Sequence, residues 1–170
     1  MFLEIRELEQ KPIRFELALP VGEIPFDSEF EQQTPLVASG TAEMQASTEE
    51  VMVRGRLEVA LRMECDRCTE PFTQVVKEEF DLIYVPAPET APGAEIAIGP
   101  SDSNVGFYDG PGLELNDILQ EQVLLALPLQ RICREDCRGI CPICGQNRNE
   151  TDCECQTRIT DERWSALRNL

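Results

Sequence analysis

Eight cysteines are the residues of this chain whose types and spacing point most directly to a chemistry. One pair with C-x-x-C spacing stands near the middle of the chain, and six more follow one another toward its end; in order they are Cys65, Cys68, Cys133, Cys137, Cys141, Cys144, Cys153 and Cys155. Zinc binds four ligands tetrahedrally at about 2.3 Å from sulfur, so its sulfurs lie about 3.8 Å apart, and a C-x-x-C turn delivers two thiolates at that separation. The spacing therefore predicts metal binding by thiolates.

Eight thiols are enough for two four-cysteine sites, and chain order suggests a division. Cys141, Cys144, Cys153 and Cys155 are close enough in sequence to form a self-contained lobe, which leaves Cys65, Cys68, Cys133 and Cys137 for the other site. Closing the loop between Cys68 and Cys133 costs about 3.7 kcal/mol, less than the roughly 10–16 kcal/mol that a structural zinc contributes. We expect one or two zinc ions, with an iron–sulfur cluster as the alternative because four thiolates hold either.

Two local features bear on the C-terminal lobe. Gly145 follows Cys144 and permits the left-handed backbone that aims N–H groups at thiolates. Cys153 and Cys155 are separated by one residue, so in an extended chain their thiols would lie about 6.5 Å apart. Glu154 must therefore bend if both are to reach one ion, and a spectator role for one of the two cysteines stays open.

Five arginines flank these cysteines in the sequence, and they are Arg67, Arg131, Arg134, Arg138 and Arg148. Two roles for them stay open. They can compensate the negative charge of thiolate-rich centres, or they can form a tip that contacts RNA phosphate locally.

Alternating apolar residues predict the strands that must position the cysteines. Residues 13–19 and 36–46 have this pattern, and residues 51–63 and 72–85 form a long hairpin whose turn holds Cys65 and Cys68. The Pro- and Gly-rich stretch 86–104 predicts a loop. Helical spacing follows over residues 115–127, with Asn116 or Asp117 as the cap and Pro128 at the end.

These elements predict an α+β fold: a mainly antiparallel β sheet or partly closed barrel, with one main helix and a C-terminal cysteine-rich zinc lobe. The expected divisions are a β-rich body over residues 1–128, a zinc-binding lobe over 129–158, and a C-terminal helix over 159–170 that packs Trp164 and Leu167 on the body.

Composition limits the function. The 170 residues include 32 Asp and Glu, 15 Lys and Arg, and no His, for a net charge of −17. Broad coating of nucleic acid is excluded, whereas a basic protein partner suits an acidic body, as does simple solvation. No apolar run approaches the roughly twenty residues of a membrane span, and the acidic start is unlike a signal peptide, so we expect a cytoplasmic protein with reduced thiols.

The cysteine-bearing stretches resemble the YceD family, also called DUF177. The resemblance is carried by Cys65-Asp66-Arg67-Cys68 with Pro71-Phe72, by the helix segment 115–128, and by residues 133–155, which include Gly139-Ile140-Cys141-Pro142-Ile143-Cys144-Gly145 and Asn147-Arg148-Asn149. It implies a factor needed for large-subunit ribosomal RNA to accumulate, and it supplies no catalytic residue.

Together these observations predict a non-catalytic factor for large ribosomal subunit assembly and 23S rRNA accumulation. Its partners would be a ribosomal protein of the large subunit and/or pre-ribosomal RNA, with no small-molecule substrate and no membrane. The chain has no P-loop, no dinucleotide-binding glycine pattern and no His base, so an enzyme is not expected. The alternatives are an iron–sulfur or thiol redox protein and a zinc-stabilised protein-interaction adaptor.

Overall fold

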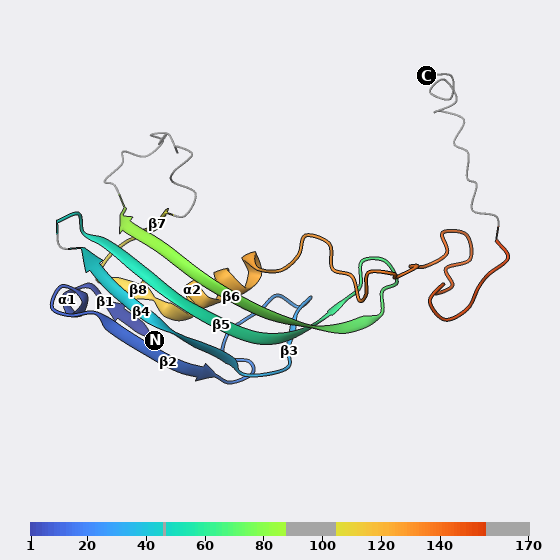
Figure 1. Cartoon of the computed structure of the whole chain (residues 1–170), viewed down its shortest axis with the longest axis horizontal. Helices are drawn as coiled ribbons and strands as arrows, with labels where there is room; N and C mark the ends of the chain where they lie inside the picture. Colours follow the sequence, from blue (N-terminus) through green and yellow to red (C-terminus); the bar gives the residue numbers. More distant parts are fainter. Residues whose placement is uncertain (46, 88–104, 156–170) are drawn as a thin grey trace, which may run out of the picture. The chain divides into compact units, whose positions relative to one another are not determined.

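A computed structural model of the chain describes residues 1–45, 47–87 and 105–155 (Figure 1). The chain forms two compact units. The first comprises Met1–Met63 and Thr73–Leu129, and the second comprises Glu64–Phe72 together with the chain from Gln130 onward. The second unit thus combines a hairpin turn from the middle of the sequence with the segment that follows the main helix. The divisions expected at residues 128 and 158 remain a prediction.

The first unit is built on a six-stranded sheet whose main path runs β2-β4-β5-β6-β7, with β3 paired to β5 beside it. The strand bounds are Ile13–Leu19 (β2), Glu31–Gln32 (β3), Leu36–Gln45 (β4), Glu50–Glu64 (β5), Pro71–Pro86 (β6) and Val105–Tyr108 (β7). The pairs β2–β4, β3–β5 and β4–β5 are antiparallel, whereas β7 runs parallel to β6. The predicted strands and hairpin are confirmed. Over the described strands the sheet is open rather than a partly closed barrel.

Alternation along β5 decides which face of the sheet is buried. Val53, Leu57 and Leu61 point into the core, while Arg54 and Arg62 alternate with them on the other face. Each residue of a strand points opposite to its neighbour, so this pattern gives the sheet one apolar and one charged face. Gly40 of β4 allows close pairing here, because an added Cβ would lie 2.2 Å from the carbonyl oxygen of Arg54.

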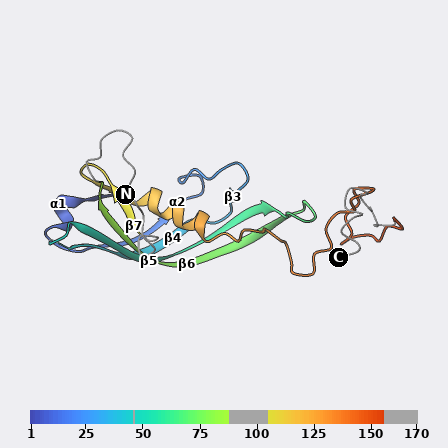
Figure 2. The ribbon, with the colours of Figure 1, turned by 90° about the horizontal axis from the view of Figure 1, so that it is seen from above.

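Helix α2, Leu115–Leu125, covers the apolar face of the sheet (Figure 2). Its buried residues Leu115, Leu119 and Val123 recur at helical spacing, as predicted. The predicted cap is wrong by two or three residues: Glu114 is the N-cap and makes no capping bond through its side chain, and Asp117 lies in the first turn. The helix ends at Leu125, before Pro128.

Several short elements lack a sequence signal. Strands β1, Phe2–Glu4, and β8, Gly112–Glu114, pair as a separate two-stranded sheet, and helix α1, Ile5–Leu8, follows β1. Within the described residues, neither α1 nor α2 has the length and apolar character needed to cross a bilayer. Most of the predicted 86–104 loop and the predicted C-terminal helix lie outside the described residues.

Candidate metal centres

The turn between β5 and β6 brings Cys65 and Cys68 together. Its backbone is closed by a hydrogen bond from the Cys65 N–H to the Glu70 carbonyl at 3.0 Å and by one from the Thr69 N–H to the Cys65 carbonyl at 2.8 Å. Thr69 adopts a left-handed backbone with φ of 60°, and its hydroxyl donates to the Cys68 carbonyl at 2.7 Å. The turn is therefore held in shape by its own hydrogen bonds.

Four thiols meet at this turn and form what we call the first centre: Cys65, Cys68, Cys133 and Cys137. Their sulfur atoms all lie within 4.8 Å of one another. The Cys65–Cys137 and Cys68–Cys133 sulfur separations are both 3.8 Å, the spacing of sulfurs around one tetrahedral zinc. Three of the thiols are buried and Cys133 is half-buried, with Phe72 and Ile132 packed against them. The thiols are free rather than joined as disulfides.

The other four thiols form a second centre: Cys141, Cys144, Cys153 and Cys155, again with sulfurs within 4.8 Å of one another. Gly145 takes the expected left-handed backbone, with φ of 74°, and its N–H donates to the Cys141 carbonyl at 2.8 Å. The Cys141 N–H in turn donates to the Gln146 carbonyl at 2.8 Å. Cys153 and Cys155 both reach the group, so their sulfurs lie closer together than the roughly 6.5 Å expected of a fully extended chain.

Backbone and amide N–H groups favour thiolates in the first centre. Burial opposes ionisation of Cys65, but N–H groups of Cys133, Arg67 and Cys68 outweigh burial and lower the pKa of its thiol to about 6. Burial likewise opposes ionisation of Cys137, and there the Asn149 amide and the Gly139 N–H bring its pKa below the usual value. By contrast, burial raises the pKa of Cys68 to about 12 and raises that of Cys133.

The second centre likewise contains one thiol with a lowered pKa and others with raised pKa values. The N–H groups of Cys144 and Ile143 lower the pKa of Cys141 to about 6. The neighbouring Cys144 sulfur, together with burial, raises the pKa of Cys155 to about 12, and Cys141 raises that of Cys153. Four sulfurs this close cannot all carry negative charge without a cation between them. Both groups of four cysteines therefore fit a metal ion that replaces the remaining protons.

An ion pair holds the segment after α2 against the hairpin turn. The Asp66 carboxylate accepts the Arg131 backbone N–H at 2.6 Å and pairs with the Arg131 guanidinium at 3.3 Å. The Asp66 N–H donates in return to the Arg131 carbonyl at 2.8 Å. These contacts place Cys133 beside the turn, and its N–H donates to Cys65 Sγ at 3.4 Å.

Asn149 links the two centres. It lies in the loop that carries the second centre, yet its amide N–H donates to Cys137 Sγ of the first centre at 3.4 Å. Its oxygen accepts the Arg138 backbone N–H at 2.8 Å and the Arg134 guanidinium at 3.1 Å. A buried glycine adds a second link, because the N–H of Ile140, next to Gly139, donates to the Arg67 carbonyl at 2.9 Å and the Gly139 carbonyl accepts the Arg148 N–H at 2.9 Å.

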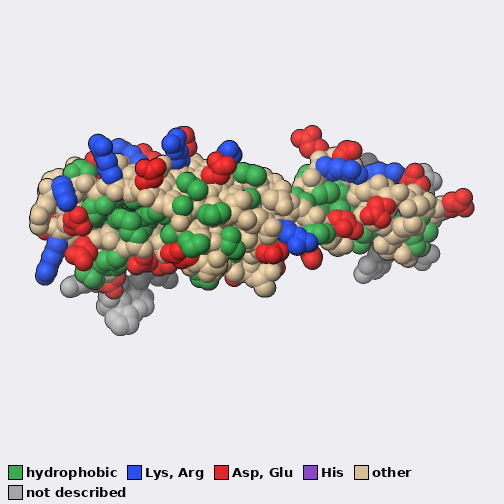
Figure 3. Space-filling model, turned by 90° about the horizontal axis from the view of Figure 1, so that it is seen from below, with side chains coloured by type: hydrophobic (Ala, Val, Ile, Leu, Met, Phe, Trp, Pro, Cys, Tyr) green, Lys and Arg blue, Asp and Glu red, His purple; other side chains and the backbone are tan. Residues whose placement is uncertain are grey.

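Most of the five predicted RNA-contacting arginines have partners within the second unit. Arg67 donates to the Cys137 carbonyl at 3.3 Å, Arg134 pairs with Asp136 at 3.3 Å, and Arg138 pairs with Asp152. Together with the Arg131–Asp66 pair, these contacts show a structural use for four of the five. Among the described residues, no ion pair involves Arg148. Figure 3 shows Arg side chains among acidic ones on the surface of this unit. Contact with RNA remains a prediction.

Sequence spacing located the thiols but not the residues that orient them. Asp66, Gly139 and Asn149 act on partners far away in the sequence or in a different loop, and no local pattern identifies such pairs. The one available signal was their position between closely spaced cysteines, where groups that bind or orient metal ligands are expected.

Comparison with known proteins identifies relatives of this chain by their sequences. The family described as "Large ribosomal RNA subunit accumulation protein YceD" matches residues 53–170, a stretch that includes all eight cysteines. An uncharacterised protein of Mycobacterium tuberculosis is 28% identical over 125 residues, which cover 73% of this chain and 57% of the relative.

Two plant proteins are also similar, and both are named "Large ribosomal RNA subunit accumulation protein YCED homolog 1, chloroplastic". The one from Zea mays is 25% identical over 62% of this chain and 46% of its own length, and the one from Arabidopsis thaliana is 24% identical over 68% and 43%. This chain thus spans about half the length of the curated relatives it matches. No solved structure matches it. Because the family match covers well over half of the sequence and all eight cysteines, the chain belongs to the YceD family.

Proposed function

We propose that this protein is a non-catalytic factor for assembly of the large ribosomal subunit and accumulation of 23S rRNA. It would act by binding a ribosomal protein of the large subunit and/or pre-ribosomal RNA. The observation that carries this proposal is the family match over residues 53–170, because the family and its plant members are named for large-subunit ribosomal RNA accumulation. The matched stretch contains the β5–β6 hairpin, α2 and both cysteine centres.

The metal in each centre would be a structural zinc ion. Sulfur separations of 3.8 Å in the first centre, and sulfurs within 4.8 Å of one another in the second, fit four thiolates on one ion. The thiolates of a multi-iron cluster bind separate irons and stand farther apart. Four protein ligands fill the tetrahedral shell and leave no position for a water molecule or a substrate, which is the arrangement of structural rather than catalytic zinc. The ions would fix the second unit as a binding surface.

The second unit offers chemistry for an RNA or protein partner. Arg134 and Arg138 are exposed although each also pairs with an acidic residue, and Arg148 is half-buried without an ion pair among the described residues. Exposed guanidinium groups bind phosphate, while Ile140 and Ile143, 44% and 51% exposed, offer apolar contact in the same unit.

Capture from cell extract tests the assembly role. Tagged protein should recover large-subunit particles, their ribosomal proteins or precursor RNA, and cells that lack it should accumulate less 23S rRNA. Recovery of none of these, with rRNA levels unchanged, would contradict the proposal and leave the adaptor alternative.

Metal analysis of anaerobically purified protein tests the zinc assignment. We expect two zinc ions and a colourless preparation, whereas a brown preparation that contains iron and sulfide would support the redox alternative. The paired variants Cys65→Ser/Cys68→Ser and Cys141→Ser/Cys144→Ser should each lose one ion. If both pairs keep full metal content, the eight thiols are not metal ligands divided in this way.

A further inference from the structure

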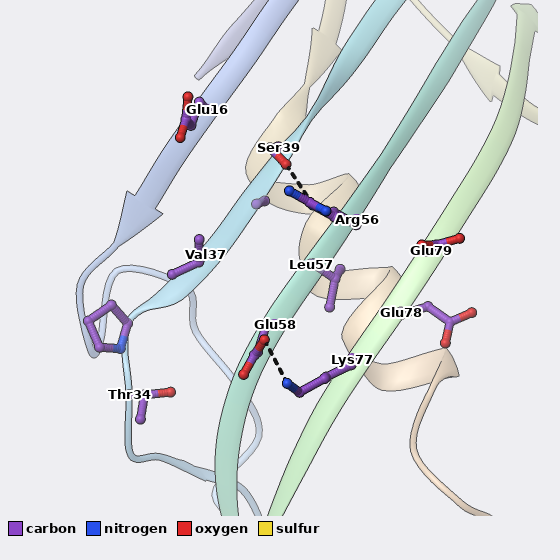
Figure 4. A pocket seen from close by; sticks show the side chains of 12 residues that line it. Glu16, Thr34, Val37, Ser39, Arg56, Leu57, Glu58, Lys77, Glu78 and Glu79 are labelled. Carbon is purple, nitrogen blue, oxygen red and sulfur yellow. Dashed lines mark hydrogen bonds and ion pairs between the residues drawn. The ribbon is translucent and has the colours of Figure 1, made fainter.

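The charged face of the sheet in the first unit contains a groove of about 660 Å³. It crosses β2, β4, β5 and β6 on the side of the sheet away from helix α2 (Figure 4). Its lining includes Glu16 of β2, Val37 and Ser39 of β4, Arg56 of β5, and Glu79 of β6. This volume lies within the range of ligand pockets, roughly 300–1,000 Å³.

The groove carries an excess of negative charge that the protein does not neutralise. Its one lysine, Lys77, already pairs with Glu58 at 3.1 Å, and Arg56 donates to the hydroxyl of Ser39 at 3.3 Å. Over the residues that the structure describes, no ion pair or hydrogen bond engages the carboxylates of Glu16 and Glu79, which lie on this face of the sheet. A cationic occupant would find two acceptors for its charges.

Apolar groups lie between these charges. Val37, the second residue of β4, is 50% exposed, and the exposed Pro35 also lines the groove. A surface with an apolar strip between carboxylates suits a chain that alternates aliphatic and cationic groups. Lys and Arg have both kinds of group, because their methylene stems cover apolar surface while their heads reach acidic partners.

We propose that this groove binds an extended, Lys- and Arg-rich segment of a protein partner. Charge complementarity decides against RNA as the occupant, since phosphates would face Glu16 and Glu79 with only Arg56 outside an ion pair. The inference builds on the proposed role in large-subunit assembly, where it would make the sheet a protein-binding surface separate from the cysteine centres.

Fluorescence anisotropy with a labelled ten-residue peptide of alternating Lys and Val tests the proposal. The zinc-loaded full chain should bind this peptide saturably and more weakly as salt rises, and should not bind the corresponding Glu–Val peptide. The variant Glu16→Lys/Glu79→Lys should weaken binding by about tenfold or more, because two carboxylates become repulsive groups. Val37→Ser, which leaves the charge unchanged, should weaken binding by about threefold through loss of apolar contact.

Matched controls separate the groove from overall charge. Glu23→Lys/Asp27→Lys makes the same charge change at exposed residues outside the groove, and Val21→Ser makes the same apolar change at a residue 56% exposed. Both controls should bind the peptide within about twofold of the unmodified protein, since distant exposed charges are screened by salt. Thermal melting should show that all four variants remain folded.

Four results would overturn the proposal. The first two are a lack of saturable peptide binding and control variants that weaken binding as much as the groove variants do. The other two are displacement of the peptide by single-stranded RNA and a dimerisation of the protein that Glu16→Lys/Glu79→Lys abolishes. The last would make a second copy of the chain the occupant. The peptide assay uses purified protein, so it is independent of the extract capture. Capture of large-subunit particles without groove-dependent peptide binding refutes the groove alone, and the reverse outcome refutes the assembly role alone.

Discussion

Replacing Asn149 by Ala should weaken zinc binding at the first centre, although Asn149 is not a ligand and lies in the loop of the second centre. Its amide N–H points at Cys137 Sγ from 3.4 Å, and its oxygen holds the Arg138 N–H at 2.8 Å. The first contact stabilises thiolate charge, and the second fixes the chain next to that ligand. The substitution removes both.

The expected size follows from these contacts. Hydrogen bonds to charged groups contribute about 1.5–3 kcal/mol, and loss of a residue that orients a metal ligand typically costs about 10–100-fold in metal affinity. Water can replace part of the lost bonding, because Arg138 and its surroundings are exposed. We therefore expect zinc affinity at the first centre to fall about 10–100-fold, or about 1.4–2.7 kcal/mol.

Competition with a chromophoric chelator measures this change, and the kinetic phase lost in Cys65→Ser identifies the first centre. Asn149→Asp is the informative companion variant, because it keeps an acceptor for the Arg138 N–H but places a carboxylate oxygen near the sulfur. It should weaken binding at least as much as Ala does. Gln146→Ala, at an exposed position in the same loop, serves as the control and should leave both centres unchanged.

The reasoning would be refuted if Asn149→Ala and Asn149→Asp both bound zinc at the first centre with the affinity of the unmodified protein. Weakening confined to the second centre would also refute it, because the amide would then act only within its own loop.

Three further results are expected. Gly139→Ala should destabilise the second unit by about 1–3 kcal/mol, because φ is 68° and an added Cβ would lie 2.8 Å from a backbone oxygen of the hairpin turn; limited proteolysis should detect this, and Gly145→Ala, with open space around the added atom, should cost less. Leu119→Ala should cost about 2–5 kcal/mol in urea unfolding followed by circular dichroism, since Leu119 is fully buried, and a loss below 1 kcal/mol would contradict the core described. Zinc affinity should rise with pH between about 6 and 9, by about tenfold per unit for each proton displaced, because the raised pKa values of Cys68 and Cys155, about 12, leave those thiols protonated without metal; a pH-independent affinity in chelator competition would show that no thiol proton is displaced.

The long strands could be predicted from sequence because their signal is local and repeated. In β5, one face carries Val53, Leu57 and Leu61, and the other carries Arg54 and Arg62. The sequence therefore predicts both the strand and its buried face. The pairing of β1 with β8 could not be predicted, because three residues near the start pair with three residues about 110 positions later. Such contacts arise from the assembled fold rather than from any pattern in either strand.

In the candidate site, too, local features could be predicted from sequence, whereas contacts that depend on packing could not. Cysteine spacing predicted two groups of four thiols, and the structure brings the same two groups together. Gly145 takes the left-handed backbone that was expected for it. The start of α2 was misplaced because Asn116 and Asp117 are favourable capping residues, yet pairing of β8 carries the chain directly into the helix from Glu114. The link from Asn149 to Cys137 could not be foreseen, since it depends on how two loops pack.

The position of the hairpin turn in the sequence also determines when the first centre can be completed during synthesis. Cys65 leaves the translating ribosome 72 residues before Cys137. At roughly 5–20 residues per second, this interval lasts about 4–14 s. Throughout that interval the group of four thiols is incomplete, and the proposed zinc ion could be enclosed only once the last of the four has been made. Supply of metal and protection from oxidants thus matter most while the polypeptide is still being made.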